Sequence, residues 1–212
     1  KECQMFVADR LRSLNLELDI FEPSQVPGFS DHPAYWPGRD YRNRPNVVGI
    51  WRGTDSTRAR SLMFSSHADV VAGNEGGRFP PFGPVRQGDK LYGRGSNDMK
   101  GGLAASIVAV RCLQELGVRL PGDVYIESVV DEEMGGSNGA LASRLRGHNA
   151  SGCIVPEPNG MCVSPAHRGG GMWNITITGA SGMPFGSSGL INPAYGIGHL
   201  IVAIEEWEQA RN

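Results

Sequence analysis

The chain has 212 residues, of which 40% are apolar and 20% are charged, a composition typical of a globular protein with one good core and part of a second unit. Its net charge of −2 provides no basic surface for nucleic acid or an anionic membrane. No stretch approaches the ~18 apolar residues of a membrane span, and the N-terminus does not resemble a signal peptide. We therefore expect a cytoplasmic protein that binds neither nucleic acid nor membrane.

The four cysteines are scattered and form no C-x-x-C pair. Cys112 lies in an apolar helical run and Cys153 in an apolar strand-like run, so both are expected to be buried, reduced thiols. This pattern argues against a thiolate zinc site and against a disulfide framework.

The first half of the chain predicts a helix, then strands separated by long loops. Residues 1–14 resemble the end of an amphipathic helix, with no capping sequence before it, so we expect a truncated chain. Strands are expected at 16–21, 46–51 and 61–65. We expect 22–45 to be a surface loop and 73–88 to be a long Gly/Pro-rich excursion, of the kind that is usually functional or mobile.

The middle of the chain alternates helices with strands. Residues 103–116 predict a helix ended by Gly117, 124–130 a strand followed by carboxylates, 138–146 a short helix and 153–155 a brief buried strand. This alternation predicts an α/β fold with a mostly parallel sheet and helices on both faces.

The pattern changes after Arg168. Trp173, Ile175 and Ile177 alternate with polar residues as in a half-buried antiparallel strand, and 197–204 carry an apolar helical face. We therefore predict that residues 1–170 form one domain and that 171–212 begin a second.

The candidate site residues follow the predicted strand ends or precede a helix: His67, Asp69, Asp98, Glu132, Glu133 and Glu157. In open α/β sheets, ligands bind at that edge. Nitrogen and carboxylate ligands without thiolates suit zinc, with cobalt or manganese as alternatives. Of the neighbouring pair Glu132 and Glu133, one carboxylate could bind metal while the other transfers a proton, and the sequence alone leaves open which does which.

Four motifs resemble the M20 metallopeptidase family in order and spacing. They are Ser66-His-Ala-Asp69, Tyr92-Gly-Arg-Gly-Ser-Asn-Asp-Met-Lys-Gly-Gly102, Glu127-Ser-Val-Val-Asp-Glu-Glu133 and Pro156-Glu-Pro158, and the resemblance extends to about Thr178. It implies an incomplete metallopeptidase catalytic domain over 1–170, with the beginning of a lid and dimerisation domain over 171–212.

The resemblance also implies a role for each site residue. His67 and Glu157 would bind one metal, Asp98 would bridge two, Glu133 would bind the second, Asp69 would support His67, and Glu132 would be the general base. The implied cofactors are two divalent ions, most simply zinc. The implied partner is a second copy of the chain, if the second domain is complete.

Two family histidines lack a counterpart here. The last metal ligand of the family would lie beyond the end of this chain, and the lid histidine falls near Gly182 or Met183. His167 and Arg168 could contact a substrate carboxylate, or could serve only a structural turn.

The expected activity is hydrolysis of the amide bond of an N-acyl amino acid or small peptide by a metal-activated water. The motifs favour the deacetylase and desuccinylase branch of the family. The alternative is a catalytically silent M20-like protein or fragment that only binds a ligand or partner. No P-loop is present, which argues against nucleotide chemistry, and we do not expect serine-hydrolase chemistry.

Overall fold

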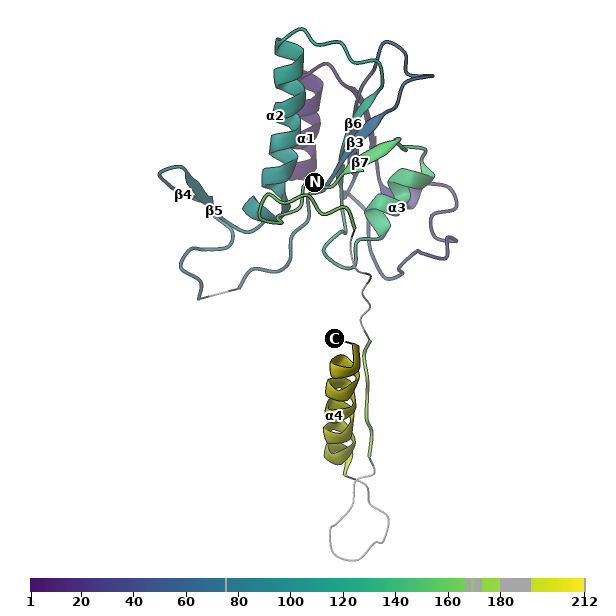
Figure 1. Ribbon diagram of the computed structural model, residues 1–212, viewed down its shortest axis with the longest axis vertical. Helices are drawn as coiled ribbons and strands as arrows, with labels where there is room; N and C mark the ends of the chain where they lie inside the picture. The colour runs from purple at the N-terminus through teal and green to yellow at the C-terminus, as the bar shows by residue number, and fades with distance from the viewer. Residues whose placement is uncertain (75, 167–168, 170–172, 180–191, 212) are drawn as a thin grey trace, which may run out of the picture. The chain divides into compact units, whose positions relative to one another are not determined.

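The computed structural model describes residues 1–212 except 75, 167–168, 170–172, 180–191 and 212 (Figure 1). The chain divides into two compact units, residues 1–163 and residues 164–212, which are described separately below.

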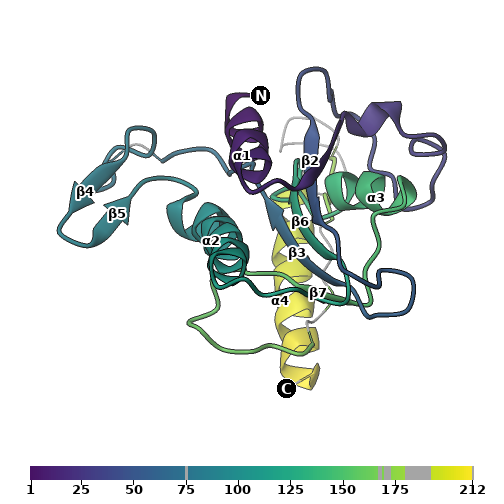
Figure 2. The ribbon, with the colours of Figure 1, turned by 90° about the horizontal axis from the view of Figure 1, so that it is seen from above.

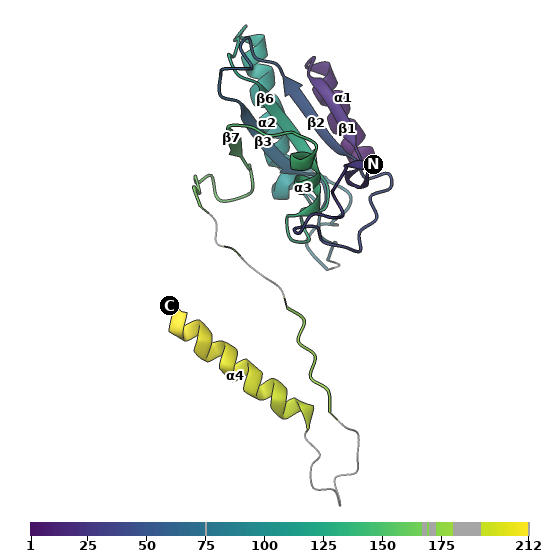
Figure 3. The ribbon, with the colours of Figure 1, turned by 90° about the vertical axis from the view of Figure 1, so that its right-hand side faces the viewer.

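A five-stranded sheet forms the centre of the first unit. Its strands are β1 (Glu17–Phe21), β2 (Asn46–Trp51), β3 (Leu62–His67), β6 (Val124–Val129) and β7 (Gly152–Ile154). They lie in the order β1-β2-β6-β3-β7, with β7 at one edge and β1 at the other (Figure 3). The β6–β3 and β3–β7 pairs are parallel, while β2 pairs antiparallel with both of its neighbours. Four strands therefore run in one direction and only β2 is reversed, as the predicted, mostly parallel α/β class requires.

Helices α1 (Glu2–Ser13) and α2 (Gly101–Glu115) cover one face of this sheet, and α3 (Asn138–Leu145) covers the other (Figure 2). On α1, Val7, Ala8 and Leu11 recur at helical spacing and enter the same apolar core as Ile126 of the sheet. Gly117 follows α2 with φ +70° and donates its N–H to the carbonyl of Gln114, which confirms the predicted C-terminal cap.

The segment 22–45 was expected to be a surface loop, but it contributes to a second core. It contains a short 3-10 helix, η1 (Pro23–Gln25), and buries Val26, Phe29 and Tyr41 against β2 and α3. The segment is mostly irregular and exposed, as expected for a surface loop, but its aromatic and apolar side chains also pack on the sheet face that carries α3.

A hairpin and an irregular turn precede α2. The hairpin pairs β4 (Val85–Gln87) with β5 (Lys90–Tyr92), and the turn η2 (Ser96–Lys100) has non-helical dihedral angles at Asp98 and Met99. Met99 is fully buried, and its sulfur accepts the backbone N–H of His67 over 3.2 Å. This contact fixes the turn against the end of β3.

The expectation that Cys112 and Cys153 are buried was also wrong. Both thiols are exposed and free, as are those of Cys3 and Cys162. The buried face of α2 carries Leu103, Ser106 and Val110, so Cys112 lies outside it. Strand β7 is at the sheet edge and all three of its residues are exposed, which places Cys153 at the surface.

The second unit contains one long helix, α4 (Pro193–Arg211), where the sequence predicted a helix over 197–204. The strand expected at Trp173, Ile175 and Ile177 is absent from the described residues: 173–179 are extended, mostly exposed and unpaired. Within this unit the side chain of Ile177 lies against Gly196. No helix in the described ranges combines the length and hydrophobicity that crossing a membrane requires.

Candidate metal centre

Three neighbouring parallel strands end at one edge of the sheet, and each leads into candidate site residues. In the register of β3 with β6, His67 lies opposite Val129, so the carboxylates that follow β6 emerge next to His67. Strand β7, on the other side of β3, leads to Glu157. The sheet topology therefore brings together side chains that are up to 90 residues apart in the sequence.

The imidazole Nε2 of His67 has three carboxylates around it. Asp98 Oδ1 lies 3.1 Å away, Glu157 Oε1 3.5 Å and Glu132 Oε2 3.7 Å. The His67 side chain is only 1% exposed, whereas that of Asp98 is 53% exposed. The cluster thus has a buried nitrogen at its base and carboxylates that open to solvent.

The other ring nitrogen of His67 faces Asp69. Nδ1 lies 3.0 Å from the carbonyl oxygen of Asp69 and 3.6 Å from its carboxylate Oδ1. An N–H on Nδ1 satisfies the carbonyl, and Nε2 then presents a lone pair to the three carboxylates. Carboxylate oxygens gathered around a lone pair repel it and each other, so this arrangement requires either a proton or a cation between them.

The donor set fits a divalent metal ion. One ligand atom from each of His67, Asp98 and Glu157 can be chosen so that all three lie within 4.8 Å of one another. A histidine nitrogen with carboxylate oxygens and no thiolate is the donor chemistry of zinc, manganese or cobalt sites.

Glu133 is held by contacts with Asp69 and Val71. Its backbone N–H donates to Asp69 Oδ2 over 3.1 Å, and its Oε1 accepts the backbone N–H of Val71 over 3.1 Å. The buried Asp69 Oδ1 has no hydrogen-bond partner among the described residues. Asp69 therefore connects the turn that carries Glu133 with the ring of His67.

Burial in the cluster raises the pKa of two carboxyl groups. For Glu132 and for Glu157, loss of solvent is the largest cause of the raised pKa; the neighbouring His67 opposes it, and nearby carboxylates, Asp98 among them, add to it. Crowding of like charges is what a cation bound at this position would relieve.

Of the eight residues named from the sequence, six lie at this edge of the sheet. The other two, His167 and Arg168, lie outside the described residues, as do Gly182 and Met183. The contacts that Asp131, next to Glu132, makes with Tyr41 and Asn138 were not predicted. Asp131 was visible as the first acid after the strand, but its partners could not be deduced from a single sequence.

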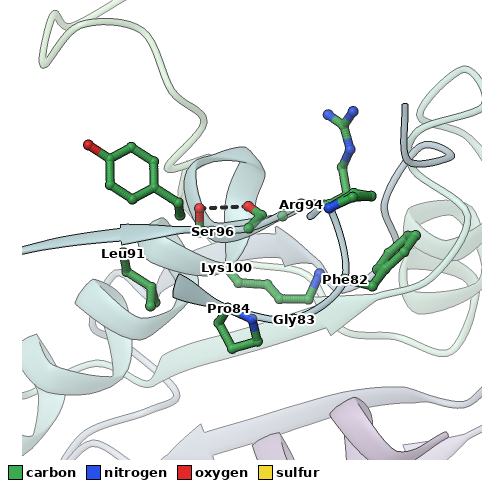
Figure 4. Close-up of a pocket in the computed structure, with 11 residues that line it drawn as sticks. Phe82, Gly83, Pro84, Leu91, Arg94, Ser96 and Lys100 are labelled. Carbon is green, nitrogen blue, oxygen red and sulfur yellow. Dashed lines mark hydrogen bonds between the residues drawn. The ribbon is translucent and has the colours of Figure 1, made fainter. Parts of the chain in front are cut away.

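A separate pocket of about 370 Å³ lies beside the hairpin (Figure 4). Its walls are mainly apolar, including Phe82, Pro84 and Leu91, and the amine of Lys100 reaches into it. None of the six clustered residues lines this pocket. The metal-ligand cluster itself is an open surface arrangement within the described part of the chain.

Comparison with known proteins agrees with the motifs. The model of peptidase family M20/M25/M40 matches residues 63–206, which is more than half of the chain. The chain belongs to this family.

Similar curated proteins include two deformylases. The N-formyl-4-amino-5-aminomethyl-2-methylpyrimidine deformylase of Bacillus subtilis (strain 168) is 41% identical over 125 residues, covering 58% of this chain and 29% of the relative. The enzyme of the same name from Halalkalibacterium halodurans is 41% identical over 119 residues, covering 55% of this chain and 28% of the relative. The matched part of this family member is therefore less than a third of each relative's length.

Solved structures share the fold at low sequence identity. An M20 family metallo-carboxypeptidase from Sulfolobus solfataricus superposes with a TM-score of 0.54 at 18% identity, covering 72% of this chain and 31% of that one. LapB from Legionella pneumophila has a TM-score of 0.50 at 15% identity, covering 74% and 36%. At these identities the likeness describes the fold alone.

Proposed function

We propose that this protein is the metal-binding part of a hydrolase that cleaves the amide bond of a small N-acyl compound. The observation that carries the proposal is the buried His67 Nε2 with three carboxylates within 3.7 Å of it. Membership of peptidase family M20/M25/M40 supports the same chemistry.

His67, Asp98 and Glu157 would hold one divalent ion, and Asp98 with Glu133 would hold a second, with zinc as the simplest choice. When bound, the ions polarise the substrate carbonyl and lower the pKa of a coordinated water. Asp69 keeps the N–H of His67 on Nδ1, which leaves Nε2 free to be a ligand. His167 and Arg168 stay candidates for contact with a substrate carboxylate.

Glu132 is the residue we assign as general base. Its Oε2 lies 3.7 Å from His67 Nε2, so the carboxylate is beside the ligand atoms, and 40% of its side chain is exposed toward the solvent from which substrate arrives. It would accept a proton from the attacking water and return it to the leaving amine.

The proposed substrates carry a short acyl group on a small amine. The two deformylase relatives hydrolyse, by their names, an N-formyl pyrimidine amine, and the sequence motifs favour deacetylases and desuccinylases. N-formyl, N-acetyl and N-succinyl amines, N-acyl amino acids and dipeptides therefore form the test panel.

Metal content and hydrolysis of this panel should be measured on the chain loaded with zinc or cobalt. We expect up to two ions per chain and release of a free amine. Glu132→Gln should reduce turnover at least ~100-fold and leave the metal content unchanged. Glu115→Gln is the matched control, since Glu115 is an exposed residue at the end of α2 that pairs with Arg111, far from the cluster in the sequence.

Two outcomes would contradict the proposal. Normal turnover in the Glu132→Gln variant would contradict the assignment of Glu132 as the general base. Full metal occupancy with no hydrolysis of any panel member favours the silent alternative, in which the chain only binds a ligand or partner.

Residues 171–212 would begin the lid and dimerisation domain of this enzyme. The helix α4, with the exposed side chains of Ile197, Ile201 and Ile204, offers apolar surface for such contacts. Light scattering after size-exclusion chromatography tests this: a mass near twice 22.8 kDa supports the dimer, and a mass near 22.8 kDa contradicts it for this length of chain.

A further inference from the structure

The turn that carries Glu132 and Glu133 has an unusual backbone. Asp131 has φ +63°, in the left-handed region that residues other than glycine rarely adopt, and Gly135 and Gly136 also have positive φ. A non-glycine residue in this region is strained and persists only when its surroundings hold it there.

Contacts of the Asp131 side chain hold its backbone in this conformation. Its Oδ2 accepts the hydroxyl of Tyr41 over 2.7 Å and lies 3.3 Å from the amide Nδ2 of Asn138. Its Oδ1 lies 3.4 Å from Nε of Arg39. The first residue of the turn is therefore bonded to the segment 22–45, about 90 residues earlier in the sequence.

Asn138, at the start of α3, is fully buried and joins the same contacts. Its Nδ2 donates to the Tyr41 hydroxyl over 2.6 Å and to the Trp36 carbonyl over 2.7 Å, and its Oδ1 accepts the Trp36 N–H over 3.0 Å. The Trp36 ring in turn packs on Gly135, where an added Cβ would lie 2.8 Å from Cζ3. A buried polar network that is fully bonded fixes one geometry.

A second buried asparagine holds the two ends of the turn together. Asn46, at the start of β2, accepts the Val130 N–H over 3.1 Å and donates to the Gly139 carbonyl over 2.8 Å. The turn is thus fixed at its first residue, at its ends and against the Trp36 ring. Among the described residues no hydrogen bond holds the Glu132 side chain, and its one ion-pair contact is with His67 Nε2 at 3.7 Å.

We propose that Tyr41 and Asn138 are positioning residues that act through Asp131 to aim Glu132 and Glu133 at the metal centre. In this proposal the segment 22–45, which carries Tyr41, helps to position the site residues and also forms part of the hydrophobic core. This inference rests on the proposed function, in which Glu132 is the general base and Glu133 is a metal ligand. Supporting residues of this kind typically change metal affinity or turnover by about 10-fold to 100-fold when removed.

The test compares Tyr41→Phe with Tyr35→Phe. Both changes remove one hydroxyl from the same segment, and both rings pack edge-on against Phe29, but the Tyr35 hydroxyl makes no hydrogen bond within the described residues. The readouts are kcat and KM on the best panel substrate and, independently of activity, the affinity and visible spectrum of bound Co²⁺. We expect Tyr41→Phe to lower kcat about 10-fold or more with little change in KM, and to weaken Co²⁺ binding by a similar factor. Tyr35→Phe should change neither.

A second pair of variants distinguishes a loss of positioning from a loss of folding. Asparagine tolerates the left-handed conformation and keeps an acceptor oxygen, whereas alanine has neither property. Asp131→Asn should therefore lose less kcat and less Co²⁺ affinity than Asp131→Ala, even after the two are matched for the folded fraction.

The outcomes separate this inference from the proposed function. Equal kcat and equal Co²⁺ affinity for Tyr41→Phe and Tyr35→Phe overturn the positioning role, while an active parent protein keeps the proposed function. An inactive parent that binds Co²⁺ contradicts the proposed function, and the cobalt readout alone then decides the positioning role. A parent that neither hydrolyses nor binds Co²⁺ overturns both.

Discussion

The Nδ1 atom of His67 lies 3.0 Å from the carbonyl oxygen of Asp69, two residues further along the chain. This local contact with a backbone carbonyl selects the ring tautomer and leaves Nε2 as the ligand atom. The Asp69 carboxylate has another task, because its Oδ2 accepts the backbone N–H of Glu133.

Asp69→Asn separates the two roles of Asp69, the contact of its backbone carbonyl with His67 and the contact of its carboxylate with the Glu133 N–H. The carbonyl contact with His67 stays, but the carboxylate that accepts the Glu133 N–H is replaced by a weaker, neutral acceptor. We expect Co²⁺ affinity to fall about 10-fold to 100-fold, as for other residues that support metal ligands. Cobalt titration followed by absorbance measures it, with the exposed Asp89→Asn as control. Unchanged affinity would show that Asp69 acts through its backbone alone.

Gly102→Ala tests the approach of α2 to the loop that carries Glu157. A Cβ at Gly102 would lie 2.1 Å from the carbonyl oxygen of Pro156, so the backbone beside Glu157 has to move. We expect a loss of about 1–3 kcal/mol in the free energy of unfolding together with weaker metal binding. Gly198→Ala in α4 is the control, since nothing lies within 4 Å of its added Cβ. A stable variant with full metal affinity would contradict the role of this contact.

Glu127 of β6 is a buried carboxylate paired with Arg144. Its side chain is 1% exposed; Oε1 accepts the Ser65 hydroxyl over 2.6 Å, and Oε2 accepts from Ser143 and Arg144. Removing Arg144 leaves this carboxylate without its cation, so Arg144→Ala should lower the free energy of unfolding by about 3–5 kcal/mol. Urea unfolding measures the loss. Arg111→Ala, which breaks an exposed pair with Glu115, should cost less than ~1 kcal/mol. Similar losses in the two variants would contradict this ranking.

Asp123 links stability to pH. Burial alone would raise its pKa, but hydrogen bonds from Ser56, the Gly53 N–H and Arg52 outweigh it and leave the pKa below its usual value. A carboxyl whose pKa is lowered by folding stabilises the protein above its unfolded-state pKa of about 3.9. That contribution disappears as the pH falls through the lower, folded-state value.

Asp123→Asn should therefore be less stable than the parent at neutral pH, and the difference should shrink as the pH falls below about 4. Thermal unfolding of both proteins between neutral and acidic pH provides the measurement. Asp9→Asn, in an exposed pair with Arg12, is the control. A difference that stays constant with pH would show that the carboxylate charge does not contribute.

The periodicity of local segments predicted most of the regular structure. The apolar repeat of α2 and its terminal Gly117 predicted that helix closely, because both are local properties of the backbone. The exposure of Cys153 could not be predicted in this way, since an apolar strand looks the same at the edge and in the centre of a sheet. The burial of Phe29 and Tyr41 in a segment rich in proline and glycine likewise depends on tertiary packing, which places them in one core with β2 and α3.

The sequence by itself determined the chemical character of this protein: a histidine and five carboxylates, without thiolates, each placed where a strand ends or a helix begins. Tertiary structure alone decided which of them meet. Parallel pairing of β6, β3 and β7 brings Glu132 and Glu157 to the same nitrogen of His67, because neighbouring parallel strands end at one edge. The tertiary structure also decided that Tyr41 donates a hydrogen bond to Asp131, a contact across 90 residues. The partner of a buried polar group depends on packing and leaves no local pattern in the chain.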